Sequence, residues 1–159
     1  MKIQPCAYLI LHNIRSSENV GSIFRTADAV GILKIFLTGI TPSPVDRFGR
    51  MNRKIAKSAL GAEHTMPFEK YPQIGKVLEN LKRQNFQIVA IEQSVNSIDY
   101  KTVKIKSKVA FVLGSEVGGL SDSVLNKSDA VVEIPMAGKK ESLNVSVAAG
   151  VAIFRMLNV

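Results

Sequence analysis

The sequence of 159 residues has only one cysteine and no long apolar segment. Its single cysteine, Cys6, cannot form an intrachain disulfide. No apolar run approaches the roughly 20 residues that a membrane-spanning helix needs, and the first residues lack the basic region, apolar core and cleavage site of a signal peptide. We therefore expect a soluble protein of the reducing cytoplasm, without a membrane span, in which Cys6 is a core residue and not a nucleophile.

Common nucleotide-binding motifs are missing as well. The first apolar run is followed by no G-x-G-x-x-G pattern, and Gly138-Lys139 lacks the upstream glycine and the following serine or threonine of a P-loop. These absences disfavour NAD-dependent and nucleotide-hydrolysing enzymes. Repeats, low-complexity tracts and linkers are also absent, so the length predicts one domain over residues 1–159.

Acidic residues are too few to balance the basic ones. The chain has 21 Lys and Arg against 13 Asp and Glu, a net charge of +8, which favours a polyanionic partner, although such a charge can also serve solubility alone. The residues from Arg47 to Lys57 include no acid, and four of their basic side chains have the spacing of one helical face: Arg50, Arg53, Lys54 and Lys57. Apolar side chains fall largely on the other face: Ile55, Ala56, Ala59 and Leu60. A second cluster, Lys101, Lys104, Lys106 and Lys108, can be a solvated strand edge.

Five short, continuous apolar runs are typical of strands buried on both faces of a parallel sheet. They are residues 7–11, 35–38, 86–91, 109–113 and 131–135. Helical patterns lie between them, notably at 19–30 and 74–83, as parallel connections require. Ser16 or Ser17 is the expected N-cap of the first helix and Gly31 its stop. The sequence thus predicts an α/β fold, with an irregular loop at 39–49.

The segments that follow two of these runs are rich in glycine and polar residues. In parallel α/β sheets ligands bind beyond the carboxyl ends of the strands, so residues 114–120 (GSEVGGL) and 136–142 (MAGKKES) are the loops to examine. The glycines allow a close approach of backbone and ligand, but they also simply make turns.

The last helical pattern, residues 143–154 (LNVSVAAGVAIF), is apolar almost all round and predicts a buried helix. Ser142 is the expected N-cap. A buried Asn144 would need a polar partner, either in a functional site or simply in a neighbouring loop. The small residues Ala148, Ala149, Gly150 and Ala152 predict close packing against another helix or backbone segment.

On the first helix, Asn19, Ser22 and Arg25 recur every three residues beside the apolar stripe. We expect Arg25 near the helix N-terminus to be held by an anion, because its charge opposes the helix dipole there. An ordinary surface arginine is the alternative. Gly21 in the first turn costs stability but permits a close approach.

Together these segments resemble the three motifs of the SpoU (TrmH) family of SPOUT methyltransferases, in the usual order. The first covers residues 13–31, with NVGSIFRTADAVG at its end, the second is FVLGSEVGGLS at 111–121, and the third runs from IPMAG at 134–138 to ESLNVSVAAG at 141–150. The resemblance spans nearly the whole chain. It implies a parallel sheet flanked by helices with a deep C-terminal trefoil knot, S-adenosylmethionine (SAM) as cofactor, and an active site completed in a homodimer.

The resemblance also implies roles for individual residues. The catalytic positions are Asn19, Arg25, Glu116, Ser142 and Asn144. The cofactor-binding positions are Ile91, Leu113, Gly114, Glu116, Ile134, Met136 and Leu143. No metal site is expected.

The implied reaction transfers a methyl group from SAM to a ribose 2′-hydroxyl of tRNA or rRNA. Our hypothesis is that Arg25 acts on a phosphate beside that ribose and stabilises the developing alkoxide, because a free guanidinium is a poor base. The extra N-terminal RNA-binding domain of many relatives is not expected here, so the cluster of Arg50, Arg53, Lys54 and Lys57 is the expected RNA contact. Two alternatives remain: an RNA-binding protein without catalysis, and methylation of a base.

Overall fold

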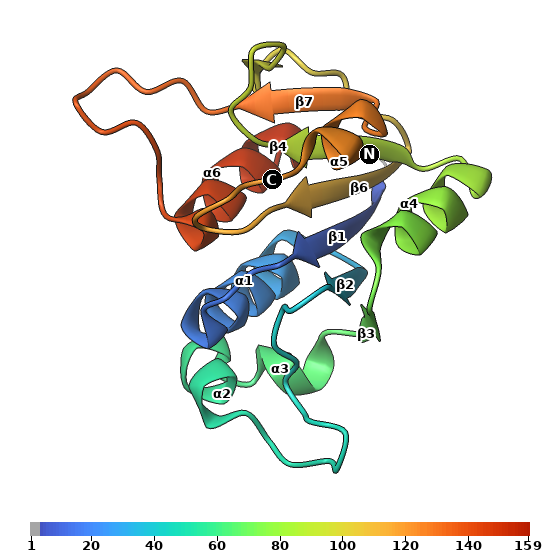
Figure 1. The fold of residues 1–159 in the computed structure, drawn as a ribbon, viewed down its shortest axis with the longest axis vertical. Coiled ribbons are helices and arrows are strands. Elements are labelled where there is room, and N and C mark those ends of the chain that lie inside the picture. Colours follow the sequence, from blue (N-terminus) through green and yellow to red (C-terminus); the bar gives the residue numbers. More distant parts are fainter. Residues whose placement is uncertain (1–3) are drawn as a thin grey trace.

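The computed structural model describes residues 4–159, and its centre is a parallel sheet of seven strands in the order β3-β2-β1-β6-β4-β7-β5 (Figure 1). In chain order the strands are β1 (Cys6–His12), β2 (Lys34–Thr38), β3 (Phe68–Tyr71), β4 (Gln87–Ile91), β5 (Ile98–Asp99), β6 (Lys108–Leu113) and β7 (Ala130–Glu133). The predicted α/β class and the five predicted strands are confirmed. The two edge strands, β3 and β5, were not predicted, because β3 carries exposed or half-buried polar residues and β5 has only two residues.

Helices cover both faces of the sheet, so the molecule has three layers (Figure 1). One face packs against α1 (Ser17–Val30), α2 (Arg53–Ala59), α3 (Ala62–Thr65) and α6 (Val145–Leu157). The other face packs against α4 (Ile74–Arg83) and α5 (Asp122–Asn126). The central strands β1, β4 and β6 are buried from both sides, which explains their continuous apolar sequences.

Helix α1 begins and ends as predicted. The Ser16 side chain accepts a hydrogen bond from the Asn19 N–H, and Gly31 closes the helix in the left-handed conformation at φ 81°. Gly21 lies where α2 crosses α1: a Cβ there would lie 2.4 Å from the Ile55 carbonyl oxygen. The close approach expected at Gly21 is therefore confirmed, and α2 is the element that makes it.

The basic helix is shorter than its sequence pattern predicts. Asn52 caps α2 by accepting the N–H groups of Lys54 and Ile55, so the helix begins at Arg53. The prediction that Arg50 shares its helical face is wrong, because Arg50 lies in the preceding loop, where its Nε donates to Asp46 at 2.7 Å. Leu60 was also misplaced, since it ends α2 with a positive φ and is exposed.

The last helix begins later than predicted and is not buried all round. Its N-cap is Asn144 and not Ser142, and the first helical residue is Val145. Ala149 and Ala152 are buried, as expected, and Gly150 lies beside Thr26 of α1. The small residues thus allow α6 to pack closely on α1. Apolar side chains are instead exposed on the outer side of α6, at Val147 and Val151, and just before the helix, at Leu143.

Between β7 and α6 the chain leaves the sheet in a long excursion and returns to pack α6 beside α1 (Figure 1). The trefoil knot that the resemblance implies in this region stays a prediction. Over residues 4–159, no helix is both long and apolar enough to cross a membrane.

Candidate active site

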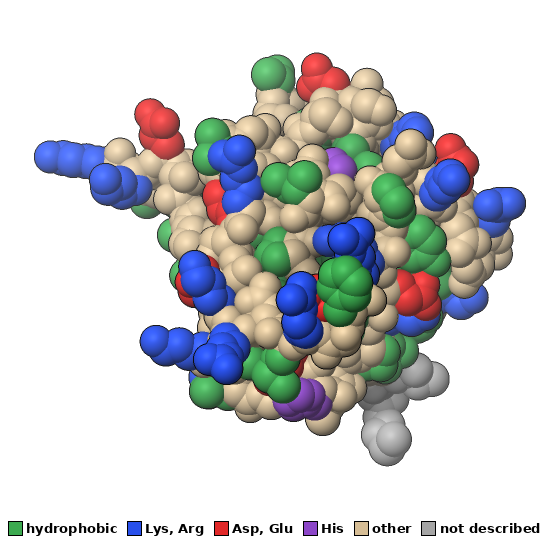
Figure 2. Space-filling model, turned by 60° about the horizontal axis from the view of Figure 1, so that its bottom comes forward, with side chains coloured by type: hydrophobic (Ala, Val, Ile, Leu, Met, Phe, Trp, Pro, Cys, Tyr) green, Lys and Arg blue, Asp and Glu red, His purple; other side chains and the backbone are tan. Residues whose placement is uncertain are grey.

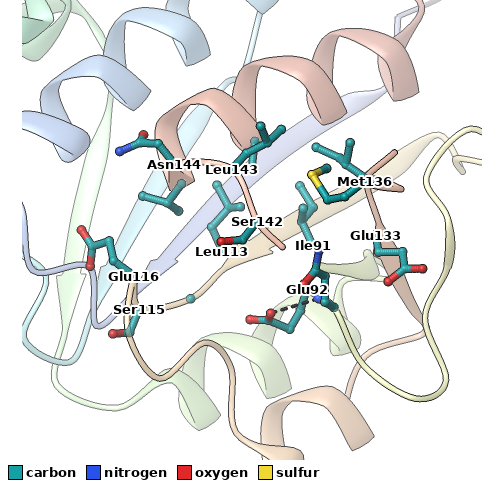
Figure 3. A pocket seen from close by; sticks show the side chains of 15 residues that line it. Ile91, Glu92, Leu113, Ser115, Glu116, Glu133, Met136, Ser142, Leu143 and Asn144 are labelled. Atoms are coloured by element: carbon teal, nitrogen blue, oxygen red, sulfur yellow. Dashed lines mark hydrogen bonds between the residues drawn. The ribbon is translucent and has the colours of Figure 1, made fainter. Parts of the chain in front are cut away.

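A cavity of about 360 Å³ opens at the carboxyl ends of β4, β6 and β7 (Figure 3). Its walls are the segments that follow these strands and the start of α6, so residues far apart in sequence meet there. This is the place where parallel α/β sheets bind ligands, and the volume lies within the range of roughly 300 to 1,000 Å³ usual for small-molecule sites. The lining residues are Ile91, Glu92, Gln93, Leu113, Gly114, Ser115, Glu116, Glu133, Ile134, Met136, Ser142, Leu143, Asn144, Val145 and Ala148.

All seven residues expected to bind the cofactor lie in this lining: Ile91, Leu113, Gly114, Glu116, Ile134, Met136 and Leu143. Two of the expected catalytic residues, Ser142 and Asn144, join them. The structure therefore brings the second and third sequence motifs together around one cavity. The roles of these residues in binding and catalysis stay predictions.

The cavity also has four polar lining residues that were not among the predicted site residues: Glu92, Gln93, Ser115 and Glu133. Glu92 and Gln93 directly follow β4, so the rule of strand ends applied to that strand would have found them. The Glu92 carboxylate accepts the N–H of Gln93 at 3.0 Å (Figure 3) and that of Leu120 at 2.9 Å. Through these bonds Glu92 links the end of β4 to the glycine-rich loop after β6.

The charge of the cavity is opposite to that of the whole chain. Three glutamates line it, Glu92, Glu116 and Glu133, and the lining includes no lysine or arginine. Part of the remaining wall is apolar, with Ile91 and Met136 among its residues (Figure 3). Such a cavity suits a ligand that combines an apolar part with positive charge.

A chain of side-chain hydrogen bonds joins the three motifs beside the cavity. The Asn19 Nδ2 donates to Glu116 Oε1 at 3.0 Å, and the Asn144 Nδ2 donates to Asn19 Oδ1 at 3.1 Å. The Glu116 carboxylate also accepts the backbone N–H of Arg15 at 2.9 Å and that of Ser16 at 3.1 Å. The start of α1, the loop after β6 and the start of α6 are therefore fixed relative to one another.

These bonds also set the ionisation of Glu116. Partial burial by itself raises the pKa of Glu116, but the N–H donors of Arg15, Asn19 and Ser16 outweigh it, so the pKa is lowered from its ordinary value. Glu116 is therefore ionised at neutral pH, which strengthens the hydrogen bonds that it accepts.

Asn144 was expected to be a buried amide in need of a polar partner, and the structure gives it another position. It is exposed and not buried, and its Oδ1 accepts the Ser146 N–H at 2.9 Å as the cap of α6. Its Nδ2 bonds Asn19, so one amide serves both as helix cap and as link to α1. Ser142, by contrast, lies exposed in the cavity wall and caps nothing.

Arg25 stands apart from these residues. It lies in the middle of α1 and not near its N-terminus, its side chain is exposed, and it does not line the cavity. The expectation of a bound anion is not met by this chain, since no hydrogen bond or ion pair of Arg25 is found within residues 4–159. Within one copy of the chain, Arg25 therefore does not line the cavity.

The glycines after β6 serve the shape of the loop. A Cβ on Gly114 would lie 2.7 Å from the backbone of Gly119, and one on Gly119 would lie 2.5 Å from Glu92 Oε2. Gly119 also has a positive φ of 62°. The loop can thus fold back on itself and onto Glu92 only with glycine at these two positions.

Comparison with known proteins agrees with this architecture. A Bacillus subtilis protein assigned to the TrmH family of tRNA/rRNA methyltransferases is 34% identical over 149 residues, which are 94% of this chain and 57% of that protein. An AdoMet-bound rRNA methyltransferase from Sinorhizobium meliloti superimposes with a TM-score of 0.84 at 28% identity, covering 97% of this chain and 56% of the other. A structure of an RNA 2′-O ribose methyltransferase gives a TM-score of 0.83 at 26% identity, covering 99% and 58%.

The chain spans a little over half the length of these curated relatives. Over its own length the match is nearly complete: the SpoU rRNA Methylase family model matches residues 7–154, which include the cavity, the hydrogen-bond chain Glu116–Asn19–Asn144 and Arg25. The protein therefore belongs to the SpoU rRNA methylase family.

Proposed function

We propose that this protein is a SAM-dependent RNA methyltransferase that methylates a ribose 2′-hydroxyl of tRNA or rRNA. The observation that carries the proposal is the acidic, partly apolar cavity held by the hydrogen bonds of Asn19, Glu116 and Asn144. Such RNA substrates would place the protein in the cytoplasm.

The lining of the cavity fits SAM. SAM carries a positive sulfonium and an ammonium group, which the carboxylates of Glu92, Glu116 and Glu133 complement, while its adenine suits the apolar walls. We assign the cofactor contacts to Ile91, Leu113, Gly114, Glu116, Ile134, Met136 and Leu143. When bound, SAM supplies an already activated methyl group, so the protein mainly has to align the acceptor.

The residues around the cavity hold this alignment. Glu116 fixes the first turn of α1 through Arg15, Ser16 and Asn19. Asn144 fixes the start of α6, so that Leu143 and Ser142 stay in the cavity wall. In this account Asn19 does not orient Arg25, because its amide is occupied by Glu116 and Asn144.

We assign Arg25 a role in the active site of a homodimer. Exposed apolar side chains lie on α6, at Val147 and Val151, and just before it, at Leu143. Because α6 packs beside α1, two copies of the chain would cover these side chains by pairing. Pairing along α1 and α6 would carry Arg25 of one copy toward the cavity of the other. There its guanidinium would bind a phosphate beside the target ribose and stabilise the developing alkoxide.

RNA binding is assigned to the basic residues of α2, Arg53, Lys54 and Lys57, with Arg50 on the loop before it. Lys54 lies 3.8 Å from Glu18, an exposed pair that phosphates can replace. The names of the relatives, tRNA/rRNA methyltransferases, support an RNA substrate. Ribose as acceptor is supported by the similar fold of the RNA 2′-O ribose methyltransferase.

The test is to incubate the protein with methyl-labelled SAM and total cellular RNA, and to digest the RNA to nucleosides. We expect the label in a 2′-O-methylated nucleoside. Label on a base would identify a base methyltransferase, and SAM binding without any labelled RNA would favour a non-catalytic RNA-binding protein.

The role of Arg25 has its own test in the same assay. Arg25→Lys keeps the charge but loses the bidentate guanidinium, so we expect turnover to fall while SAM binding is unchanged. Near-normal turnover of this variant would rule out a specific guanidinium role.

A further inference from the structure

The loop between β2 and α2 carries a small hairpin whose tip is Phe48. Val45 and Met51 form an isolated antiparallel bridge, and Asp46 N–H donates to the Arg50 carbonyl at 2.9 Å. The Asp46 Oδ1 accepts the backbone N–H of Phe48 at 2.8 Å and that of Arg50 at 2.9 Å. The segment predicted as irregular therefore contains a hydrogen-bonded turn that presents one aromatic ring.

The ring of Phe48 is 67% exposed and has a guanidinium on either side of it in sequence. The Arg47 guanidinium carbon lies 4.7 Å from the ring centroid, and that of Arg50 lies 5.1 Å from it. Both distances are within the range of cation–π interactions. An exposed phenylalanine buries little apolar surface, so its contribution to folding is small and a binding role is the better explanation.

The two arginines differ in how they are held. Arg50 Nε donates to Asp46 Oδ2 at 2.7 Å, and the Arg50 N–H lowers the pKa of Asp46, so this ion pair persists at neutral pH. For Arg47 the described part of the chain contains no ion pair or hydrogen bond of the side chain. Arg50 is therefore fixed against the ring, while Arg47 can leave it.

The hairpin is also fixed relative to the rest of the molecule. Asn52 Nδ2 donates to Ser17 Oγ at 3.2 Å, which ties the end of the loop to the start of α1, and Asn52 also caps the basic helix α2. On the side of the molecule that carries these elements, Lys and Arg side chains alternate with exposed hydrophobic ones (Figure 2). This combination of positive charge and apolar faces is typical of surfaces that bind unpaired nucleotides.

We propose that Phe48 is a stacking platform for an unpaired base of the RNA substrate, with Arg50 fixed against the ring and Arg47 moving onto a phosphate of the same strand. The proposal rests on the proposed function in that RNA is the partner. It specifies single-stranded RNA, such as a loop or an end, because the bases of a duplex are stacked on each other and offer no free face.

A tryptophan in place of Phe48 tests the platform directly. The sequence contains no tryptophan, so Phe48→Trp creates the single tryptophan fluorophore of the chain. Titration with a short single-stranded oligoribonucleotide of mixed sequence is expected to quench its emission, since a base would stack on the indole. The same oligoribonucleotide annealed to its complement is expected to quench much less.

Affinity measurements with matched variants separate stacking from apolar contact. Phe48→Leu and Phe48→Ala are expected to weaken binding of the single strand by roughly 5- to 100-fold, whereas Phe48→Tyr keeps it. The dependence of affinity on salt should not change in Phe48→Leu, because the ring contacts no phosphate.

The outcomes separate this proposal from the proposed function. Binding of RNA without quenching of the indole emission in Phe48→Trp, or normal affinity of Phe48→Leu, would overturn the platform and leave the methyltransferase proposal standing. If the unaltered protein bound neither the oligoribonucleotide nor tRNA, the proposed RNA substrate and the platform would both be wrong.

Discussion

Asn19, Glu116 and Asn144 connect three parts of the chain that are far apart in sequence, and each uses its side chain fully. Glu116 accepts three N–H groups, while Asn19 and Asn144 each donate once and Asn144 also caps a helix. Because both oxygens of the Glu116 carboxylate accept hydrogen bonds, replacing one of them by a donor should have a measurable effect.

Glu116→Gln makes that change with little effect on volume. An amide offers one acceptor oxygen where the carboxylate offers two, so at least one of the three N–H donors at the start of α1, those of Arg15, Ser16 and Asn19, loses its partner. Since the site is partly exposed, we expect a loss of about 1 kcal/mol in the free energy of unfolding. Thermal or denaturant unfolding measures it, with Glu141→Gln as control, because Glu141 is exposed and its side chain accepts no hydrogen bond within residues 4–159.

The dependence of this loss on pH checks its cause. Because the folded state lowers the pKa of Glu116 below the ordinary 4.5, its stabilising contribution is complete above pH 4.5 and is lost as the pH falls through the lowered value. The difference in stability between the unaltered protein and Glu116→Gln should therefore shrink in acid. A difference that stays constant down to low pH would show that the charge of Glu116 is not responsible.

The structure brings several of the predicted site residues together, in part for a different reason than the sequence suggested. Asn144 was expected to be buried and is exposed as a helix cap, because α6 begins at Val145 and leaves one side uncovered. The hydrogen bond between Asn144 and Asn19 joins residues 125 apart, and no local pattern encodes it. Glu92 and Glu133 were not predicted because each is a single acid next to or within an apolar run.

Among the helices, α1 has the central position, because it packs against α2 on one side and α6 on the other. The sequence predicted its bounds well, since Ser16 is a strong local start signal and Gly31 a strong stop signal. It predicted α2 poorly: the basic spacing extends back to Arg50, but Asn52 stops the helix from starting there. The capping residues therefore predict where these helices begin and end better than the spacing of apolar or basic side chains does.

Gly21→Ala tests the crossing of α1 and α2. The new methyl would lie 2.1 Å from Ser58 Oγ and 2.4 Å from the Ile55 carbonyl oxygen, and the latter cannot rotate away. We expect a loss of about 1 to 3 kcal/mol in the free energy of unfolding. The matched control is Gly150→Ala, whose methyl would have its nearest neighbour at 3.8 Å and should be neutral or stabilising by up to about 1 kcal/mol. Equal effects of the two substitutions would refute a steric role of Gly21.

The basic side of α2 can be tested through salt. Replacing Arg53, Lys54 and Lys57 by glutamine should weaken RNA binding and reduce the slope of log affinity against log salt concentration by about 2, if each contacts one phosphate of a single strand. The control is a variant that loses the same number of positive charges elsewhere, with glutamine at Lys101, Lys104 and Lys106. The assignment fails if the two triple variants lose the same affinity and the same slope.

In the whole molecule, the parallel sheet brings segments that are distant in sequence together at one site. The carboxyl ends of β4, β6 and β7 lie at one edge, so the residues after residue 91, after 113 and after 133 meet in one cavity. This much followed from the sequence, because continuous apolar runs predict a parallel sheet and the strand ends predict the site. The position of Arg25 did not follow, since it depends on which side of α1 the neighbouring helices leave open.

The proposed dimer predicts the effect of a charge on the exposed outer side of α6. Val147 is 49% exposed, so Val147→Asp should leave the fold intact but place buried, unpaired charges between two copies. We expect sedimentation or size-exclusion measurements to show a dimer for the unaltered protein and a monomer for this variant, with loss of methyl transfer. Val95→Asp, on a fully exposed valine in the loop after β4, is the control and should remain a dimer. An unaltered protein that is monomeric and active would contradict the role given to Arg25.

The central claim is that the methyl group goes to a ribose 2′-hydroxyl, and alkaline hydrolysis of the labelled RNA tests it most directly. Alkali cleaves RNA through attack of the free 2′-hydroxyl on the adjacent phosphate, so a 2′-O-methyl group protects the bond next to it. After reaction with methyl-labelled SAM, the account predicts that the label appears in alkali-resistant dinucleotides. Label in mononucleotides would place the methyl on a base and contradict the claim.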